Sequence, residues 1–260
     1  MLCFQNSWKM VQARIKLIFF LIIPLKLFSQ GEFNNWYFGD HAGVTFASGY
    51  PVALTNSAMF CPGVSISISD SSGNLWFYSD AFHVYNKNHS LMPNGSGLFG
   101  PNASYSQHIL AVQKISDDSS FYIFTTGQFN PFGISLPVVY SMLNMRLDGG
   151  LGDIEPGKKN IPLPYATTGW CAITGTRHQN NKDVWVVLRL ANADSNFFVS
   201  YFIDESGLDT IPIFSYSSIT ELPFPIIDIA MNLNISPDGS KLVCRYTSDT
   251  CEFCNFNKIT

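Results

Sequence analysis

The sharpest chemical motif in the chain is Cys251-Glu252-Phe253-Cys254. A Cys-x-x-Cys pair can supply half of a zinc site or form a redox pair. A structural zinc site needs two more ligands at matching spacing, yet the nearest other thiol is Cys244 and no histidine follows His178. The sequence therefore favours structural cysteines over a metal or redox site.

The remaining thiols of the chain beyond residue 30 are Cys61 and Cys171, which stand far from any other cysteine. Five cysteines in an exported chain cannot all pair internally, although an oxidising compartment permits disulfides. A Cys244–Cys251 link across adjacent strands stays open at this stage.

Histidines and serines show no local catalytic pattern. None of the five histidines lies in a His-Glu-x-x-His or His-x-His arrangement. His83 and His89 lie near Asp80 in a strand-to-loop segment, where we expect them to be solvated or to stabilise turns. No Gly-x-Ser-x-Gly elbow occurs, so a Ser-His-Asp triad stays open only because triads assemble in space.

Two acidic turns, Asp70–Asn74 and Asp117-Asp118, offer oxygen ligands that calcium could use. Neither has the 12-residue alternating pattern, so we expect ordinary Asx turns. The glycine pair in Gly150-Leu151-Gly152 continues into Asp153 and Glu155, whose charge would repel phosphate. The sequence thus predicts no catalytic, cofactor-binding or metal residues and no cofactor.

The elements that carry these residues follow a period of two, which is typical of strands. Four segments repeat an apolar strand, a polar turn and a second apolar strand, and each is predicted to form a β-hairpin. These segments are Val64–Tyr78, Ile109–Thr125, Cys171–Leu190 and Leu233–Tyr246.

The spacing of the hairpins predicts the architecture. Taking Trp76, Tyr122, Trp185 and Leu242 as equivalent positions, the steps are 46, 63 and 57 residues. A period of about 40 to 50 residues with four strands per unit is typical of propeller blades. We therefore predict an all-β, propeller-like fold of about four antiparallel blades, with insertions; a β-sandwich is the alternative.

Composition agrees with this fold class. The 260 residues are 46% hydrophobic and only 13% charged, which excludes a disordered chain. Aromatic residues make up 15%, and 19 glycines with 14 prolines punctuate the strands. A net charge of −4 argues against nucleic-acid binding, which usually needs a basic stripe.

Residues 1–30 have the pattern of a secretory signal peptide. Lys9, Arg14 and Lys16 precede the apolar run Leu17–Leu25, and no acidic residue occurs before Glu32. A transmembrane anchor would need roughly 20 apolar residues, so we predict export with cleavage near Ser29 or Gln30. Removal of this segment takes away four basic residues and leaves 11 basic against 19 acidic, a net charge of −8. Such a chain should not bind anionic membranes or DNA.

Five stretches form a recognisable set of strand and turn motifs: Asn34–Phe46, Ser69–Asp80, Val84–Gly95, Leu147–Asp153 and Ser236–Gly239. Together they resemble the opening of secreted Bacteroidetes proteins that begin with a WD40-like or YVTN-like β-propeller. Members of this group often end in a sorting signal for type IX secretion. The resemblance covers residues 31–260 and implies a propeller fold and an address outside the cell, but no reaction.

The resemblance also places Cys251 and Cys254 on a strand, where positions i and i+3 point to opposite faces. Compared with the family pattern, the chain stops at Thr260 inside what resembles the last strand of a blade. We therefore expect an incomplete ring, because the chain is a fragment or because it closes against another copy.

The leading functional hypothesis is an exported, non-catalytic recognition or scaffolding module for an unknown extracellular protein or glycan. The alternative is a glycan-acting propeller hydrolase or lyase with carboxylates such as Asp40 and Asp80 near the channel. Sugar stacking would require exposed rings at Trp36, Trp76, Trp170 and Trp185; we expect core packing instead. A structural spacer for a further domain is a third possibility.

Overall fold

The computed structural model describes residues 31–100, 107–127, 137–166, 170–191, 196–219, 232–245 and 250–259. The predicted signal segment, residues 1–30, lies outside them. The regular structure of the described ranges is strand, apart from two single-turn 3-10 helices, η1 (Gly31–Phe33) and η2 (Asp148–Gly150). No helix there is long and apolar enough to cross a membrane.

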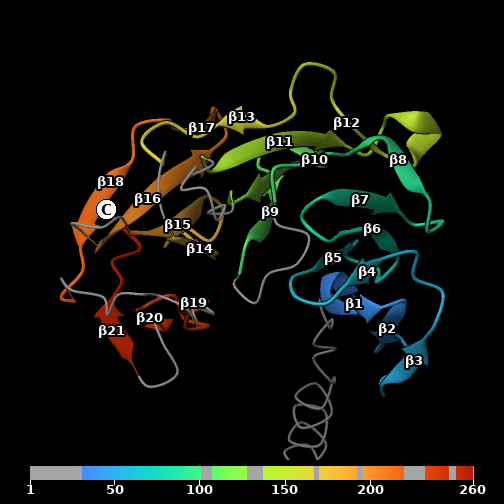
Figure 1. The fold of residues 1–260 in the computed structure, drawn as a ribbon, viewed down its shortest axis with the longest axis horizontal. Coiled ribbons are helices and arrows are strands. Elements are labelled where there is room, and N and C mark those ends of the chain that lie inside the picture. Colours follow the sequence, from blue (N-terminus) through green and yellow to red (C-terminus); the bar gives the residue numbers. More distant parts are fainter. Residues whose placement is uncertain are drawn as a thin grey trace, which may run out of the picture. The chain divides into compact units, whose positions relative to one another are not determined.

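The strands form five antiparallel sheets that follow one another along the chain (Figure 1). The first has the order β3-β2-β1-β4 and the second the order β5-β6-β7-β8. Their strands are β1 (Asn35–Asp40), β2 (Ala42–Thr45), β3 (Val52–Leu54), β4 (Phe60–Cys61), β5 (Ile66–Ser69), β6 (Leu75–Ser79), β7 (His83–Asn86) and β8 (Leu91–Ser96).

The third sheet has the order β12-β11-β10-β9 with β13 paired to β11, and the fourth has the order β14-β15-β16-β17 with β18 paired to β16. The fifth sheet is β19-β20-β21. Their strands are β9 (Ile109–Lys114), β10 (Asp117–Thr125), β11 (Val139–Asn144), β12 (Asp153–Ile154), β13 (Ile161–Pro162), β14 (Trp170–Arg177), β15 (Val184–Ala191), β16 (Asn196–Asp204), β17 (Gly207–Leu208), β18 (Ile213–Tyr216), β19 (Asn232–Ile235), β20 (Lys241–Arg245) and β21 (Cys251–Asn255).

Successive sheets meet along their inner strands, with contacts running from β1 to β5, β5 to β9, β9 to β14 and β14 to β19, and the second and third sheets also meet through β8 and β12. This radial succession is the arrangement of β-propeller blades, so the predicted fold class is confirmed. In Figure 1 the sheets β1–β4 and β19–β21 stand at the two ends of the series. No extensive contact joins these two sheets within the described ranges, in agreement with the predicted open ring.

The structure has five blades, one more than the predicted number of about four. All four predicted hairpins form, as β5–β6, β9–β10, β14–β15 and β19–β20. The first strand of each hairpin forms the inner edge of its sheet. The additional blade is β1–β4, whose first hairpin turns at Gly39 and His41 with φ of 62° and 53°. This tight turn lacks the polar run by which the other four were recognised.

The acidic turns are Asx turns, as predicted. Asp70 Oδ1 accepts hydrogen bonds from the N–H groups of Ser72 and Asn74, both at 2.9 Å. Gly73 in the same turn has φ of 90°, a conformation that favours glycine. Asp117 likewise accepts from Ser119 N–H at 3.1 Å, and in a third turn Asp238 accepts from Ser240 N–H at 3.0 Å. These hydrogen bonds fix the hairpins and hold the carboxylates in the turns.

Four apolar clusters fill the four interfaces between consecutive sheets. The largest lies between the third and fourth sheets and includes Val112, Phe124 and Val199. Trp76 packs into the cluster between the second and third sheets and Trp185 into the cluster between the fourth and fifth, as expected for core aromatics. Trp36 is instead 50% exposed on the outer face of the first sheet, which no further sheet covers within the described residues.

Candidate functional site

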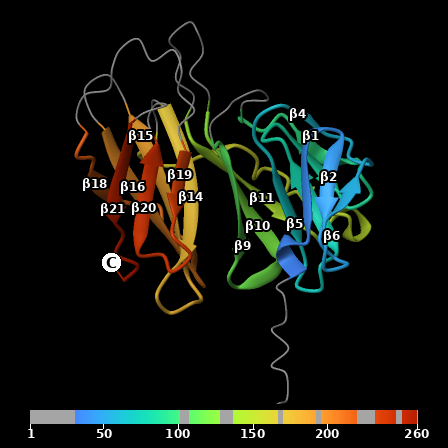
Figure 2. The same cartoon turned by 90° about the horizontal axis from the view of Figure 1, so that it is seen from below.

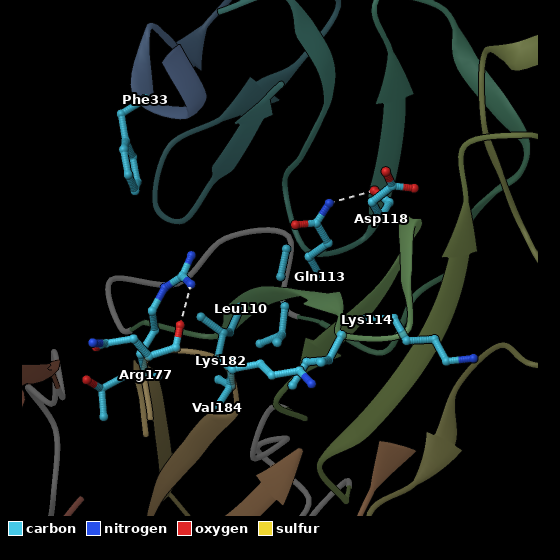
Figure 3. A pocket seen from close by; sticks show the side chains of 14 residues that line it. Phe33, Leu110, Gln113, Lys114, Asp118, Arg177, Lys182 and Val184 are labelled. Atoms are coloured by element: carbon cyan, nitrogen blue, oxygen red, sulfur yellow. Dashed lines mark hydrogen bonds between the residues drawn. The ribbon is translucent and has the colours of Figure 1, made fainter. Parts of the chain in front are cut away.

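The third and fourth sheets enclose a pocket of about 550 Å³ (Figure 3). It lies where the inner strands β9 and β14 approach each other, at the end that carries the β9–β10 and β14–β15 turns (Figure 2). Phe33 of η1, whose side chain is exposed, closes the pocket from the first blade. The pocket is therefore built by strands far apart in the sequence and opens at one face of the propeller.

The pocket exists because β9 and β14 separate along their length. Both are edge strands of their sheets, and Ile173 N–H donates to the carbonyl of Gln107 at 3.2 Å near one end. Further along, Leu110 still packs on the fourth sheet, since a Cβ added at Gly175 would lie 3.2 Å from Leu110 Cδ2. Beyond these residues no backbone hydrogen bond joins the two strands in the described part of the chain.

The backbone groups of β14 that face the pocket follow from the alternation of hydrogen bonds in antiparallel pairs. His178 N–H donates to the carbonyl of Asp183 at 2.8 Å beside the turn. The N–H and C=O groups of Thr176 must therefore point toward β15. Those of Gly175 and Arg177 point away from β15, into the pocket.

The same argument applies to β9. Thr126 N–H donates to the carbonyl of His108 at 2.9 Å, which directs the even-numbered residues of this strand toward β10. Ala111 and Gln113 consequently turn their backbone groups toward the pocket. No hydrogen bond to these groups from any described residue is present. The pocket is thus flanked by two strand edges with open donors and acceptors.

The side chains of the pocket combine an apolar floor with a charged rim. Leu110, Ile115 and Val184 supply apolar contacts on the floor. Figure 3 shows Arg177 and Lys182 on one side and Phe33 and Asp118 on the other. Lys114 also contributes to the lining, so three cations and one carboxylate surround the opening.

Hydrogen bonds position part of this rim. The Arg177 guanidinium donates to the carbonyl of Asn181 at 2.9 Å within the β14–β15 turn. Lys182 pairs with Glu205, and this contact raises the pKa of the Lys182 ammonium. Asp118 lies 3.9 Å from Arg146, outside the pocket. The positive charges of Lys114 and Arg177 remain, and they favour a ligand that carries carboxylates or another anionic group.

The structure places the sequence-predicted cysteines away from this pocket. Cys251 and Cys254 lie on β21, paired with Arg245 and Leu242 respectively, and so face opposite sides of the sheet as predicted. Cys254 packs against the core, whereas Cys251 is exposed. Burial and the neighbouring Glu252 raise the pKa of the Cys254 thiol.

No disulfide joins Cys244 to Cys251, so the open question of a link between them is answered against a bond. Burial raises the pKa of the Cys61 thiol, which donates to the carbonyl of Val64 at 2.7 Å. The side chain of Cys171 lies outside the described set. Among the described residues no three His, Cys, Asp or Glu side chains come together as a metal site would require.

The histidines hold local structure. His83 Nδ1 lies 3.0 Å from Asp80 Oδ2, and His41 Nδ1 lies 2.8 Å from the carbonyl of Ser57. His89 has φ of 59° in the β7–β8 turn and a pKa lowered by burial. None of them lines the pocket. His108 is buried near the far end of β9 and is discussed below.

The carboxylates named for a glycan-acting enzyme are also elsewhere. Asp80 is buried, and its Oδ1 accepts hydrogen bonds from the N–H groups of Phe82 and His83 at 2.9 and 2.5 Å. Asp40 is exposed at the end of β1, 3.5 Å from His41. Asp118 is the single carboxylate among the described residues that line the pocket.

Sequence reasoning missed the pocket, although one signal was present. A glycine inside a strand often marks a close backbone approach, and Gly175 is such a residue in β14. The opposite strand, β9, carries no comparable sign. Comparison of the chain with protein-family models, with curated proteins and with solved structures gave no match.

Proposed function

We propose that the chain is an exported recognition module that binds its partner in the pocket between β9 and β14. The observation that carries this proposal is a pocket of about 550 Å³ with an apolar floor, a mostly cationic rim and open backbone groups. A few polar groups above an apolar floor are characteristic of binding sites. The signal-like segment, residues 1–30, supports a location outside the cell.

A binding role also agrees with the chemistry of the lining. Hydrolysis of a glycosidic bond generally uses two carboxyl groups about 5 to 9.5 Å apart. Among its described lining residues the pocket offers Asp118 alone, without histidine or cysteine beside it. The turn carboxylate Asp80, one of the two candidates for such an enzyme, is committed to backbone N–H groups and a histidine ring.

The test is a binding array of peptides and glycans, run with a panel of glycan, peptide and ester substrates on the same preparation of residues 31–260. We expect saturable binding without turnover, and at least tenfold weaker binding by Lys182→Glu. Lys87→Glu, an exposed lysine in the β7–β8 turn, is the matched control and should bind normally. Turnover abolished by Asp118→Asn, or binding unchanged in Lys182→Glu, would contradict the proposal.

Export is tested separately by N-terminal sequencing of the secreted chain. The first residue should lie near Gln30 or Gly31. Recovery of the intact Met1 terminus in the membrane fraction would count against export with cleavage.

A further inference from the structure

The fifth sheet ends at an open strand edge. In the described ranges it has three strands, whereas each of the other four sheets has four or five, and β21 is its outermost strand. Phe256 N–H donates to the carbonyl of Ser240 at 2.9 Å, so the backbone groups of the even-numbered residues of β21 point toward β20. Those of Cys251, Phe253 and Asn255 therefore point outward, and no hydrogen bond reaches them from any described residue.

The fourth sheet extends beyond this edge. Cys254 of β21 packs in one cluster with Phe198 and Phe202 of β16, and β18 continues the fourth sheet beyond β16 by one strand. In Figures 1 and 2, β18 and β21 both stand at the same end of the series of blades. Ile213 of β18 pairs with Ser200 and so faces the fifth sheet, as Phe198 does, yet its side chain is 46% exposed. This face of β18 is therefore uncovered beside the open edge of β21.

An apolar pocket of about 220 Å³ lies on the same face of the fourth sheet. Phe202, Ile211 and Ile213 contribute to its lining, and Ile211 is 75% exposed. The Glu252 carboxylate accepts a hydrogen bond from the hydroxyl of Ser217 at 2.7 Å, which holds β21 beside the end of β18. An unpaired strand edge next to an uncovered apolar surface is a template for pairing with another extended chain.

We propose that an extended peptide segment of a partner protein adds to β21 as the fourth strand of the fifth sheet, antiparallel to it. A peptide backbone supplies donors and acceptors at the spacing of the three outward residues, whereas the hydroxyl groups of a glycan follow no such alternation. The fourth sheet extends beneath this position by one strand, which suits a single added segment. The site is separate from the pocket between β9 and β14.

The register predicts the sequence of the segment. Glu252 and Cys254 face the fourth sheet, so the Phe253 ring, which is 80% exposed, lies on the outer face. The residue opposite Phe253 shares that face, where an aromatic or β-branched side chain is favoured. Its two neighbours point toward Ile213 and the apolar pocket, where apolar side chains are favoured.

A charge at the edge adds one further position. Lys241 Nζ donates to Asn255 Oδ1 at 2.6 Å, so its ammonium lies over β21 toward the open edge. An acidic residue opposite Asn255 would meet this cation. In an antiparallel pair that residue comes two positions before the one opposite Phe253. The segment therefore has the order acidic, apolar, aromatic or β-branched, apolar.

The variants separate the backbone from the side chain. Phe253→Pro deletes an outward N–H, and an edge strand tolerates proline where that N–H is unpaired. Phe253→Ala removes the same ring but keeps the N–H. Ala53→Pro is the matched control, because Phe46 N–H bonds the carbonyl of Asn34 and the Ala53 N–H consequently lies on the outer edge of β3. Thermal unfolding establishes that the three variants fold.

The probe is a display library of random heptapeptides selected on the purified chain, followed by titration of the enriched peptides after synthesis. We expect the predicted order of residues, at least tenfold weaker binding by Phe253→Pro than by Phe253→Ala, and normal binding by Ala53→Pro. Lys241→Glu should weaken binding at least fivefold, whereas Lys182→Glu, the variant that tests the other pocket, should bind normally. In the complex of the unmodified chain, amide hydrogen exchange at Phe253 should slow at least tenfold.

Other outcomes would overturn strand addition. Equal affinities of Phe253→Pro and Phe253→Ala, or unchanged exchange at Phe253 in the complex, would show that the edge is not paired. Peptides weakened by Lys182→Glu but not by Lys241→Glu bind the pocket between β9 and β14, which supports the proposed function and refutes this site. A dimer of the chain that Phe253→Pro dissociates would assign the edge to a second copy instead.

Discussion

Buried His108 should make the stability of this propeller depend on pH between about 4 and 6.5. Its ring is 7% exposed, with Nδ1 against the hydroxyl of Thr126. Burial lowers the pKa of His108 from 6.5 to about 4. The imidazole is therefore kept neutral in the folded chain at pH values where the unfolded chain would already be protonated.

The sign of the effect follows from proton linkage. Because the folded pKa is lower than the unfolded pKa, the unfolded state binds the extra proton between pH 6.5 and 4. The contribution of His108 to stability is complete above pH 6.5, falls as the pH falls, and levels off below about 4. With 1.36 kcal/mol per pKa unit, acidification from pH 8 to pH 5 should remove about 2 kcal/mol, and the full shift corresponds to about 3 kcal/mol.

The assay is urea unfolding of the native chain and of His108→Gln at pH 8, 6.5 and 5. Other titrating groups, including His89, are common to both proteins and cancel in the difference between them. We expect the stability advantage of the native chain over the variant to shrink by about 2 kcal/mol between pH 8 and pH 5. Equal pH dependence of the two proteins, at equal m-values, would refute the reasoning.

Three further predictions concern individual contacts. Asp153→Ala should lower the free energy of unfolding by about 1 to 3 kcal/mol, because Asp153 accepts two hydrogen bonds from Asn94 that join β12 to β8. Urea titration measures the loss, and an effect within error would show that these bonds are unimportant for stability. Cys251→Ser should leave the metal content unchanged, because Cys251 and Cys254 face opposite sides of β21; stoichiometric zinc that disappears in the variant would contradict this. Glu252→Gln should destabilise the chain by about 1 to 3 kcal/mol, because the Glu252 carboxylate accepts hydrogen bonds from Ser217 and Ser218. Urea unfolding measures the change, and unchanged stability would argue that the charge of Glu252 is not needed for these bonds.

The fold could be predicted wherever local chemistry is strong. The turns Asp70–Asn74 and Ser236–Ser240 each place a carboxylate oxygen on a backbone N–H and a glycine at positive φ, so their strands form hairpins irrespective of the rest. The first blade was not predicted from the sequence, because its β1–β2 hairpin turns within His41 and its immediate neighbours. Short turns of this kind leave no polar run in the sequence.

The pocket could not be predicted because it depends on a relation between two strands that never pair extensively. Leu110 and Gly175 are 65 positions apart in the sequence, and their approach is set by how the third and fourth blades pack around Val112 and Ile173. The sequence of each strand alone shows only the alternation of apolar and polar residues that is typical of a strand at a sheet edge. The separation of β9 from β14 beyond these residues is a property of the assembled blades.

The polar groups of this propeller divide into carboxylates that hold turns in place and backbone groups at the inner strand edges. Asp70, Asp80, Asp153 and Asp238 all accept hydrogen bonds from backbone N–H groups, so they hold turns and strand ends in place. Carboxylates used in this way are not free to act as bases or ligands. The inner strand edges beside the pocket are different, because no hydrogen bond from a described residue satisfies their outward donors and acceptors.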